Sequence, residues 1–391
     1  MPLTKIQFAP GVNKEGTEYT ADAGWFDSDK VRFRKGRPEK IGGWTKYSTS
    51  TFLGVCRSLH DWASLESIRY IGLGTHLKFY VNQGASYHDV TPIRSTTSAG
   101  DVTFAATDGS STITATDTAH GANINDFVTF SDAASLGGNV TAAVLNQEYQ
   151  IASVPTANTF TFVAKDTSGT TVTANSSDSG NGGSSTVGAY QIGVGLNAYV
   201  EGTGWGAGAW GEGTFGSVSS LSASSQLRLY SQDNFGEDLI FNVRAGGVYY
   251  WDESAGTSSR AVDLSSLSGA SNTPTVALQV MVSDVDQHVI CFGANPIGSS
   301  NIDPLFVRWS DQENAADWTP TATNTAGGSR INSGSTIVGA VQSRQEILIF
   351  TDASLHSMRF VGSPFIFQFS TLSTDISMIS PNAAVNARGV V

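Results

Sequence analysis

Residues that could carry out chemistry are few in this chain, and their spacing fits no common catalytic or metal-binding motif. The six histidines are His60, His76, His88, His120, His288 and His356. None lies in an HExxH spacing, which places two imidazoles on one helix face for zinc. His60-Asp61 could join a serine in a hydrolytic triad, but the sequence has no Gly-x-Ser-x-Gly turn to hold that nucleophile. We therefore expect histidines that pair within strands or face solvent, with no catalytic, metal or cofactor site.

One stretch carries the residue types of a carbohydrate-processing turn. Residues 310–318 resemble the Asp-box turn of sialidases, which has the pattern Ser-x-Asp-x-Gly and a tryptophan. Here Asp311 follows its serine directly, the glycine is missing and the motif occurs once, whereas the box repeats from blade to blade. We expect a structural turn instead, in which Asp311 and Asp317 cap backbone groups while Trp309 and Trp318 anchor the loop.

A glycine-rich stretch at residues 202–216 alternates glycine with Trp205, Trp210 and Phe215. A phosphate-binding loop would need a strand before it and a helix after it, and the sequence that follows is rich in serine. We expect a loop anchored by its aromatic residues against neighbouring strands, with no nucleotide site.

A basic strand is predicted near the N-terminus. Because side chains alternate along a strand, Lys30, Arg32 and Arg34 should share one face, with Val31 and Phe33 on the other. This basic face could contact DNA, a partner subunit or solvent, and we assign it to a protein interface or solvent.

A short unit recurs along the chain: an apolar strand, a tight turn and a second strand rich in aromatic residues. The clearest copy is Leu239–Trp251, in which Gly246-Gly247 is expected to form a two-residue hairpin turn. Similar units or single strands are Arg69–Val81, Leu227–Tyr230, His288–Gly293 with Leu305–Trp309, Ile347–Phe360 and Phe365–Phe369. Repeated antiparallel hairpins of this kind predict an all-β, β-propeller-like fold whose copies share their cores.

The composition supports this fold class and excludes several functions. Charged residues are only 14% of the 391 residues and glycines number 42, as in turn-rich β-structures. The formal net charge is −12, whereas a protein that grips nucleic-acid phosphates should be basic. Cys56 and Cys291 lie in or next to apolar strands, which predicts buried free thiols. The sequence shows no signal peptide and no apolar run near the roughly 20 residues of a membrane span, so we expect assembly in a cytoplasm.

A compositional shift near residue 95 indicates an inserted module. Residues 95–190 hold eight acidic side chains and one basic side chain, Lys165, and so carry −7 of the net charge. Short strands are predicted at Ser111–Thr116, Phe127–Ser131, Tyr149–Val154 and Thr159–Val163. The Ser/Gly/Thr-rich stretch Thr167–Ser185 is expected to be a flexible exit linker. The predicted domains are therefore 1–94 (N-terminal strands and first propeller unit), 95–190 (acidic β-module) and 191–391 (remaining propeller units).

Three stretches, in this order, resemble the tail nozzle proteins of short-tailed bacteriophages, also called tail tubular protein B or DNA-stabilisation protein. They are Asp29–Trp44, Trp309–Trp318 and Glu346–Phe365, within the regions 1–93 and 225–391. In the insert, Asp126–Phe130, Leu145–Ile151 and Asn158–Phe162 resemble small β-modules of phage tail proteins. Those modules are similar to a catalytic-cysteine half-domain of ubiquitin-activating enzymes, whose chemistry is not implied.

The resemblance implies a structural virion protein rather than an enzyme. It implies self-association into a ring, as a hexamer, in the virion tail, with the head-to-tail adaptor protein and tail fibres or a second nozzle polypeptide as partners. Genomic DNA would pass through the ring without specific binding. The alternative is a propeller-type glycan-binding adhesin or depolymerase, which would act on glycan in isolation.

The last residues bear on whether the propeller closes within the chain. Val385–Val391 is apolar enough to be a strand and has no returning partner in the sequence. Since an unpaired apolar edge strand promotes aggregation, we expect a second polypeptide or neighbouring ring subunits to supply the remaining blades.

Overall fold

The computed structural model describes residues 9–15, 17–20, 23–43, 45–197, 227–387 and 391. These residues form two compact units, one up to Thr49 and one from Ser50 onward. The predicted domains did not include this division, since they joined the N-terminal strands to the first propeller unit. The glycine-rich stretch 202–216 lies outside the described residues.

The N-terminal unit is a short hairpin of β1 (Val31–Arg34) and β2 (Arg37–Lys40), preceded by the 3₁₀ turn η1 (Glu18–Thr20). As predicted, Arg32 and Arg34 are exposed, and Val31 and Phe33, which alternate with them, are half-buried. Lys30 precedes the strand with a left-handed backbone (φ 55°) and is exposed as well. An exposed ion pair joins Arg32 to Glu39 across the hairpin at 3.1 Å.

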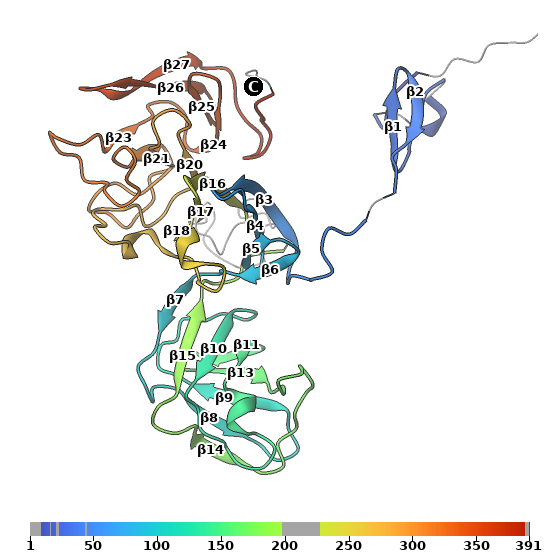
Figure 1. The fold of residues 1–391 in the computed structure, drawn as a ribbon, viewed down its shortest axis with the longest axis vertical. Coiled ribbons are helices and arrows are strands. Elements are labelled where there is room, and N and C mark those ends of the chain that lie inside the picture. Colours follow the sequence, from blue (N-terminus) through green and yellow to red (C-terminus); the bar gives the residue numbers. More distant parts are fainter. Residues whose placement is uncertain (1–8, 16, 21–22, 44, 198–226, 388–390) are drawn as a thin grey trace, which may run out of the picture. The chain divides into compact units, whose positions relative to one another are not determined.

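The second unit contains, among its described residues, four antiparallel meanders, each a four-stranded sheet whose strands follow one another in sequence (Figure 1). The first meander comprises β3 (Cys56–Ala63), β4 (Arg69–Thr75), β5 (Phe79–Gln83) and β6 (Ser86–Asp89). The second comprises β16 (Tyr230–Phe235), β17 (Asp238–Val243), β18 (Val248–Trp251) and β19 (Val262–Asp263), with 3₁₀ turns η2 (Glu253–Ala255) and η3 (Leu264–Ser266). The third comprises β20 (Gln279–Val282), β21 (Val289–Phe292), β22 (Phe306–Trp309) and β23 (Gly327–Arg330). The fourth comprises β24 (Ile337–Gln342), β25 (Ile347–Thr351), β26 (Leu355–Gly362) and β27 (Ile366–Ser373).

The all-β fold of repeated antiparallel hairpins is confirmed, but the turn of its clearest copy differs from the prediction. Strand β17 ends at Val243 and β18 begins at Val248, which leaves four residues between them rather than a two-residue turn. The left-handed residue is Ala245 (φ 56°), and neither Gly246 nor Gly247 has positive φ. Gly247 is needed for close approach, because a Cβ there would lie 2.5 Å from the Tyr249 hydroxyl.

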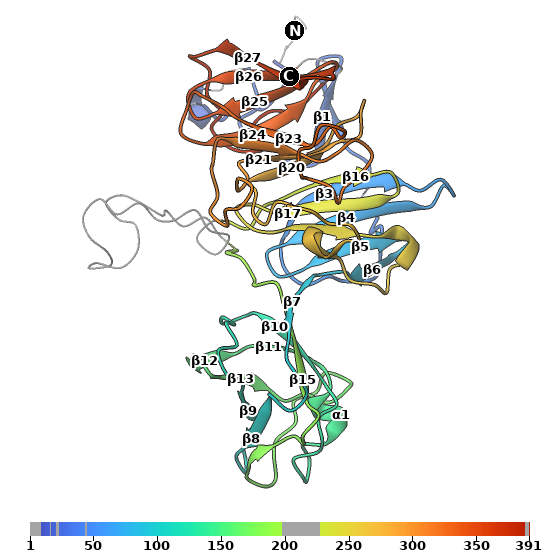
Figure 2. The ribbon, with the colours of Figure 1, turned by 90° about the vertical axis from the view of Figure 1, so that its left-hand side faces the viewer.

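The third meander lies between the second and the fourth (Figure 2), and apolar cores lie between meanders that are neighbours in sequence. The first and second meanders share Trp62, Phe79, Phe241 and Trp251, in which the rings of Phe79 and Phe241 stack 3.8 Å apart. The second and third share a cluster around Ile240, Val280, Cys291 and Trp318. The third and fourth share a cluster around Phe292, Trp309, Ile349 and Met358. The second and third sheets are thus apolar on both faces, which explains why their strands lack a strict apolar–polar alternation.

The predicted C-terminal strand Val385–Val391 is absent from its described part, and residues 388–390 lie outside the described residues. The described residues 385–387 contain no regular strand, and Val385 is 75% exposed. The segment instead returns to the fourth meander: the Met378 amide donates to the Thr351 carbonyl, and the Asn386 side chain donates to the Gln342 carbonyl. Met378 itself is 8% exposed and lies against Gly339 of β24. The C-terminal segment therefore covers part of the fourth meander.

The insert, β7 to β15, leaves the chain after the first meander and returns before the second. It has two antiparallel sheets, ordered β11-β10-β15-β7 and β12-β13-β9-β8-β14. Its elements are β7 (Ile93–Thr96), β8 (Thr103–Ala106), β9 (Thr112–Thr116), β10 (Phe127–Ser131), α1 (Ala142–Leu145), β11 (Glu148–Gln150), β12 (Ser153–Thr156), β13 (Thr159–Val163), β14 (Asp178–Asn181) and β15 (Val187–Gln191). Between the sheets lies an aromatic core that includes Phe104, Phe130, Phe160 and Phe162. The insert thus has a core of its own.

The predicted flexible exit linker of the insert is wrong. Strand β14 lies within this stretch and pairs with β8, with Asp178 opposite Ala106. Ala174 is 3% exposed in the aromatic core. The composition misled the prediction because small polar residues form strands and tight turns as readily as linkers. The loop before β14 is held by Asp166, whose carboxylate accepts from the Ser168 and Thr170 amides.

The two cysteines differ in exposure. Cys291 is fully buried, and burial raises the pKa of its thiol to about 12. Cys56 is exposed at the start of β3, so its predicted burial is wrong. Both thiols are free.

We predict that the meanders fold without the insert. Its ends are adjacent, because Thr96 of β7 pairs with Ala189 of β15. Replacing residues 97–188 by Asn-Gly should close a two-residue hairpin between these paired positions. The shortened chain should show one cooperative thermal transition and a β-type circular dichroism spectrum. A control deletion of the third meander, which removes two of the shared cores, should aggregate. Aggregation of the insert-free chain as well would contradict the prediction.

Candidate functional site at the inner strands

The first strand of each meander has one edge that pairs with no strand of its own sheet. Unpaired edge N–H and C=O groups must find other partners when they are buried. The first strands β3, β16, β20 and β24 are here called the inner strands. The edges of β20 and β24 obtain these partners from side chains of the neighbouring inner strand, and β3 and β16 are joined by bonds between their side chains.

Strand β16 bonds to β20 through its odd-numbered side chains. The Val280 amide donates to Ser231 Oγ at 2.8 Å, and the Val282 amide donates to Asp233 Oδ2 at 2.9 Å. The Ser231 hydroxyl in turn donates to Asn242 Oδ1 at 3.1 Å, which fixes its orientation. Two edge amides of the third meander are thereby satisfied by the second.

The even-numbered side chains of β16 bond to the first meander, since alternate residues of a strand face opposite sides. Gln232 Nε2 donates to Ser58 Oγ at 3.0 Å, and Asn234 Oδ1 lies 3.3 Å from His60 Nε2. His60 is thus the strand-pairing histidine that was predicted. Asp61 is exposed and follows it on the opposite face, which leaves no triad at this position.

Strands β20 and β24 are joined by one amide side chain. Gln279 accepts from the Ala340 amide at 2.7 Å and donates to the Ala340 carbonyl at 2.8 Å. The side chain reproduces the pair of bonds that a neighbouring strand would make. It links the third meander to the fourth.

A cavity of about 440 Å³ lies along the inner strands. Its lining comes from β3, β16, β20, the loop after β17, and Pro381 and Asn382 of the C-terminal segment. The ionisable residues among the lining are Arg57, Asp233 and Arg244. Burial raises the pKa of the Asp233 carboxyl, and the bonds it accepts from the Val282 and Asn234 amides oppose that rise. Glycosidases use a pair of carboxylates, whereas the described lining of this cavity contributes one.

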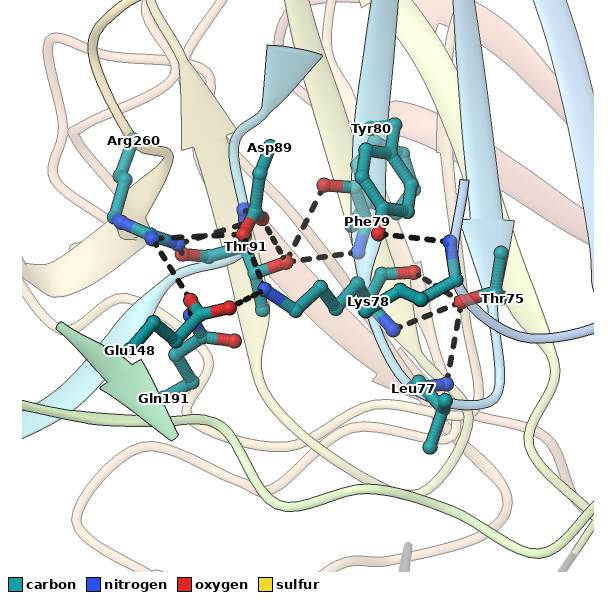
Figure 3. A network of polar contacts seen from close by, with 11 residues as sticks. Thr75, Leu77, Lys78, Phe79, Tyr80, Asp89, Thr91, Glu148, Gln191 and Arg260 are labelled. Atoms are coloured by element: carbon teal, nitrogen blue, oxygen red, sulfur yellow. Dashed lines mark hydrogen bonds and ion pairs between the residues drawn. The ribbon is translucent and has the colours of Figure 1, made fainter. Parts of the chain in front are cut away.

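A second polar cluster, here called the joint, connects the insert to the meanders (Figure 3). Lys78 Nζ lies 2.7 Å from Asp89 Oδ2 of β6 and also pairs with Glu148 of β11. Arg260, before β19, reaches the same two carboxylates at 3.4 and 3.5 Å. The Lys78 side chain is only 4% exposed. Two cations and two anions from the first meander, the second meander and the insert are thus compensated in one place.

The charges of the joint hold Asp89 ionised. Burial opposes its ionisation, but Lys78, Arg260 and the hydroxyl of Thr91 outweigh that effect, so the pKa of Asp89 lies below its usual value. A carboxyl whose folded-state pKa is depressed stabilises the fold above its unfolded-state pKa, about 4. This contribution is lost as the pH falls through the folded-state pKa.

Of the remaining histidines, His288 comes nearest to a catalytic arrangement. Its Nδ1 lies 2.5 Å from Asp286 Oδ2, and its Nε2 lies 3.0 Å from Thr325 Oγ1. However, the ring is fully buried and packs against Phe360 and Phe367 of the fourth meander. No substrate can reach it in this conformation, so the arrangement holds two sheets together.

The other histidines have mostly structural environments. His356 lies between Ser354 and Thr371 at 2.8 and 3.2 Å, and burial lowers its pKa. His76 accepts from the Val55 amide, and burial, with two nearby arginines, lowers its pKa. His120 is buried against Phe160 in the insert, and His88 is half-buried on β6.

The Asp-box-like stretch is the structural turn that was predicted. Asp311 accepts from the amide of Thr325 at 2.8 Å, and Asp317 accepts from the Ser271 hydroxyl at 2.6 Å. Trp309 and Trp318 are 6% and 1% exposed and serve as anchors.

Neither a metal centre nor a membrane span is found in the described parts of the chain. Among these residues, no three His, Cys, Asp or Glu side chains come together as ligands. No helix there is long and apolar enough to cross a bilayer.

Comparisons with known proteins give little guidance. No family model and no curated protein sequence matches the chain. Among solved structures, it is similar to the phage phi92 endosialidase, at 11% identity and a TM-score of 0.22. The match covers 84% of this chain and 44% of that protein, so the chain spans less than half of the endosialidase. A TM-score this low carries no argument about fold or function.

Sequence reasoning missed both polar clusters. Strand β16, with the sequence YSQDNF, was placed too early, at Leu227–Tyr230, because it lacks the expected apolar residues. A strand with polar side chains on both faces is the available signal for an inner strand. The joint gave no such signal, because its four residues are scattered between positions 78 and 260.

We predict that Lys78→Met destabilises the protein by about 3 kcal/mol, because it leaves two partly buried carboxylates with Arg260 alone. The destabilisation should shrink as the pH falls below about 4 and through the depressed pKa of Asp89, because a protonated Asp89 no longer needs the Lys78 cation. Urea unfolding at pH 7 and near pH 3 measures both effects.

The matched control is Arg330→Met, which removes an exposed pair with Asp303 (2.8 Å, Arg330 side chain 56% exposed) and should cost less than about 1 kcal/mol. Equal losses in the two variants would show that the joint is an ordinary surface cluster.

Proposed function

We propose that the chain is a structural subunit of the tail nozzle of a short-tailed bacteriophage. The observation that carries this proposal is the serial order of the meanders, in which each shares its core with the next in sequence. The stretches that resemble nozzle proteins fall on these elements: one on β1 and β2, one on the end of β22 and its loop, and one on β25 and β26.

The proposed assembly is a ring of six copies that meets a head-to-tail adaptor protein above and tail fibres or a second nozzle polypeptide nearby, in the virion tail. The net charge of −12 supports passage of DNA without specific binding, because like charge disfavours phosphate contact. The insert carries most of this charge and is attached to the meanders at the ion-paired joint. This arrangement suits a module exposed on the surface of the subunit.

The buried polar groups of the meanders also support a structural role. Ser231, Gln232 and Gln279 are all bonded to a neighbouring inner strand. Asp286 and His288 are closed to solvent, and Thr325 is half-buried. These groups stabilise contacts between sheets, although the buried Oε1 of Gln232 has no hydrogen-bond partner.

We predict that the purified chain alone forms heterogeneous oligomers and that the adaptor converts it into uniform rings. Light scattering coupled to size exclusion, followed by negative-stain electron microscopy, distinguishes these states. A capsular polysaccharide of the host, incubated with the same samples, should keep its viscosity. A stable monomer that ignores the adaptor and cleaves the polysaccharide would refute the nozzle proposal in favour of the depolymerase alternative.

A further inference from the structure

Arg244, on the loop after β17, is a half-buried cation with no ion-paired carboxylate among the described residues. Its Nη1 and Nη2 donate to the carbonyls of Leu278 and Ile337, at long distances of 3.4 and 3.5 Å. Burial alone lowers its pKa to about 10, and no acidic neighbour offsets the effect. The guanidinium lies at the cavity of the inner strands.

The more deeply buried cations of the described chain are Arg228, Arg308 and Lys78. Arg228 donates to the Gly193 carbonyl and lies over the Tyr230 ring, but its Nε has no hydrogen-bond partner. The other two are better compensated. Arg308 is 1% exposed, but it donates to the carbonyls of Asn295 and Asn272 and lies over the ring of Trp318. Lys78 has two carboxylates in the joint. By comparison, the two hydrogen bonds of the Arg244 guanidinium are long, and Arg244 lines the cavity.

A second arginine makes the cavity more positive. Arg57 of β3 lines the same cavity, and one end of its guanidinium bonds to the Asn197 carbonyl. Its Nε is buried and has no hydrogen-bond partner. The carboxylate of Asp233, also in the lining, is already engaged by two backbone amides. Two arginines therefore line the cavity, and the one carboxylate in its described lining is already bonded to backbone amides.

We propose that this cavity binds a small anion through a carboxylate or phosphate group held by Arg244 and Arg57. Guanidinium binds both groups through paired, charge-assisted hydrogen bonds. The volume of about 440 Å³ falls within the range of small-molecule sites. The anion would supply the counter-charge that Arg244 lacks and would bridge the first, second and third meanders. The inference does not depend on the nozzle proposal, because it concerns one chain in isolation.

The test compares the wild-type protein with Arg244→Gln and with the control Arg330→Gln. Thermal unfolding is followed in chloride buffer and in rising inorganic phosphate or acetate at matched ionic strength; the two arms distinguish phosphate from carboxylate. Phosphate also stabilises proteins non-specifically by exclusion from their surface. Only a shift that saturates with concentration therefore counts as binding.

We expect a saturating rise in the melting temperature for the wild type and for Arg330→Gln. For Arg244→Gln, the apparent affinity should fall about tenfold or more, since a hydrogen bond to a charged group is lost. In chloride alone, Arg244→Gln should be at least as stable as the wild type, because it removes an uncompensated, half-buried charge.

Three results would overturn the proposal: no saturating shift in the wild type, an equal loss in Arg330→Gln, or an intact shift in Arg244→Gln. If Arg244→Gln is less stable in every buffer and its melting temperature still rises with the anion, then Arg244 has only a structural role, as donor to the carbonyls of Leu278 and Ile337. Should Arg244→Gln fail to fold, Arg57→Gln provides the same comparison at the other end of the site.

Discussion

The fold depends on how the free edges of its inner strands are satisfied. An edge strand buried among other sheets cannot leave its amides unbonded, because each unpaired group costs about 1–3 kcal/mol. The side chains of β16 point alternately to its two neighbours: Ser231 and Asp233 accept from edge amides of the third meander, while Gln232 and Asn234 bond to side chains of the first. Gln279 repeats the device between the third and fourth meanders. The apolar cores farther out supply most of the stability, and these polar bonds set the register between sheets.

The same arrangement of strands explains where polar side chains gather. Strand β16 carries polar side chains on both faces, so arginine, glutamine, serine and aspartate line the space along the inner strands together with apolar residues such as Leu59, Leu278 and Met281. The joint uses a different solution, in which Lys78 and Arg260 hold the carboxylates of Asp89 and Glu148 at the root of the insert. One cluster couples the meanders to each other, and the other couples the meanders to a module with a separate core.

Sequence reasoning recovered what is locally encoded. The β-branched and aromatic runs at Phe127–Ser131 and Thr159–Val163 are strands with those bounds, because their alternation reports burial directly. Strand β16 and the joint could not be predicted in this way, because their residues bond to partners far away in the sequence. Ser231 bonds to Val280, and Lys78 pairs with Glu148. The predictions for the stretch Thr167–Ser185 and for the loop at Ala245 were wrong for a related reason. Composition indicates a turn or a linker but does not show which residue bends the chain.

Amide hydrogen exchange in the variant Ser231→Ala tests the central claim, that inner-strand side chains satisfy the edges of the neighbouring sheet. The change removes one hydroxyl, which accepts from the Val280 amide, and leaves Asp233, which accepts from the Val282 amide, as an internal reference. The account predicts that exchange at Val280 quickens about tenfold, in line with the loss of one hydrogen bond, while Val282 and the amides of β17 keep their protection. Unchanged exchange at Val280 would contradict it.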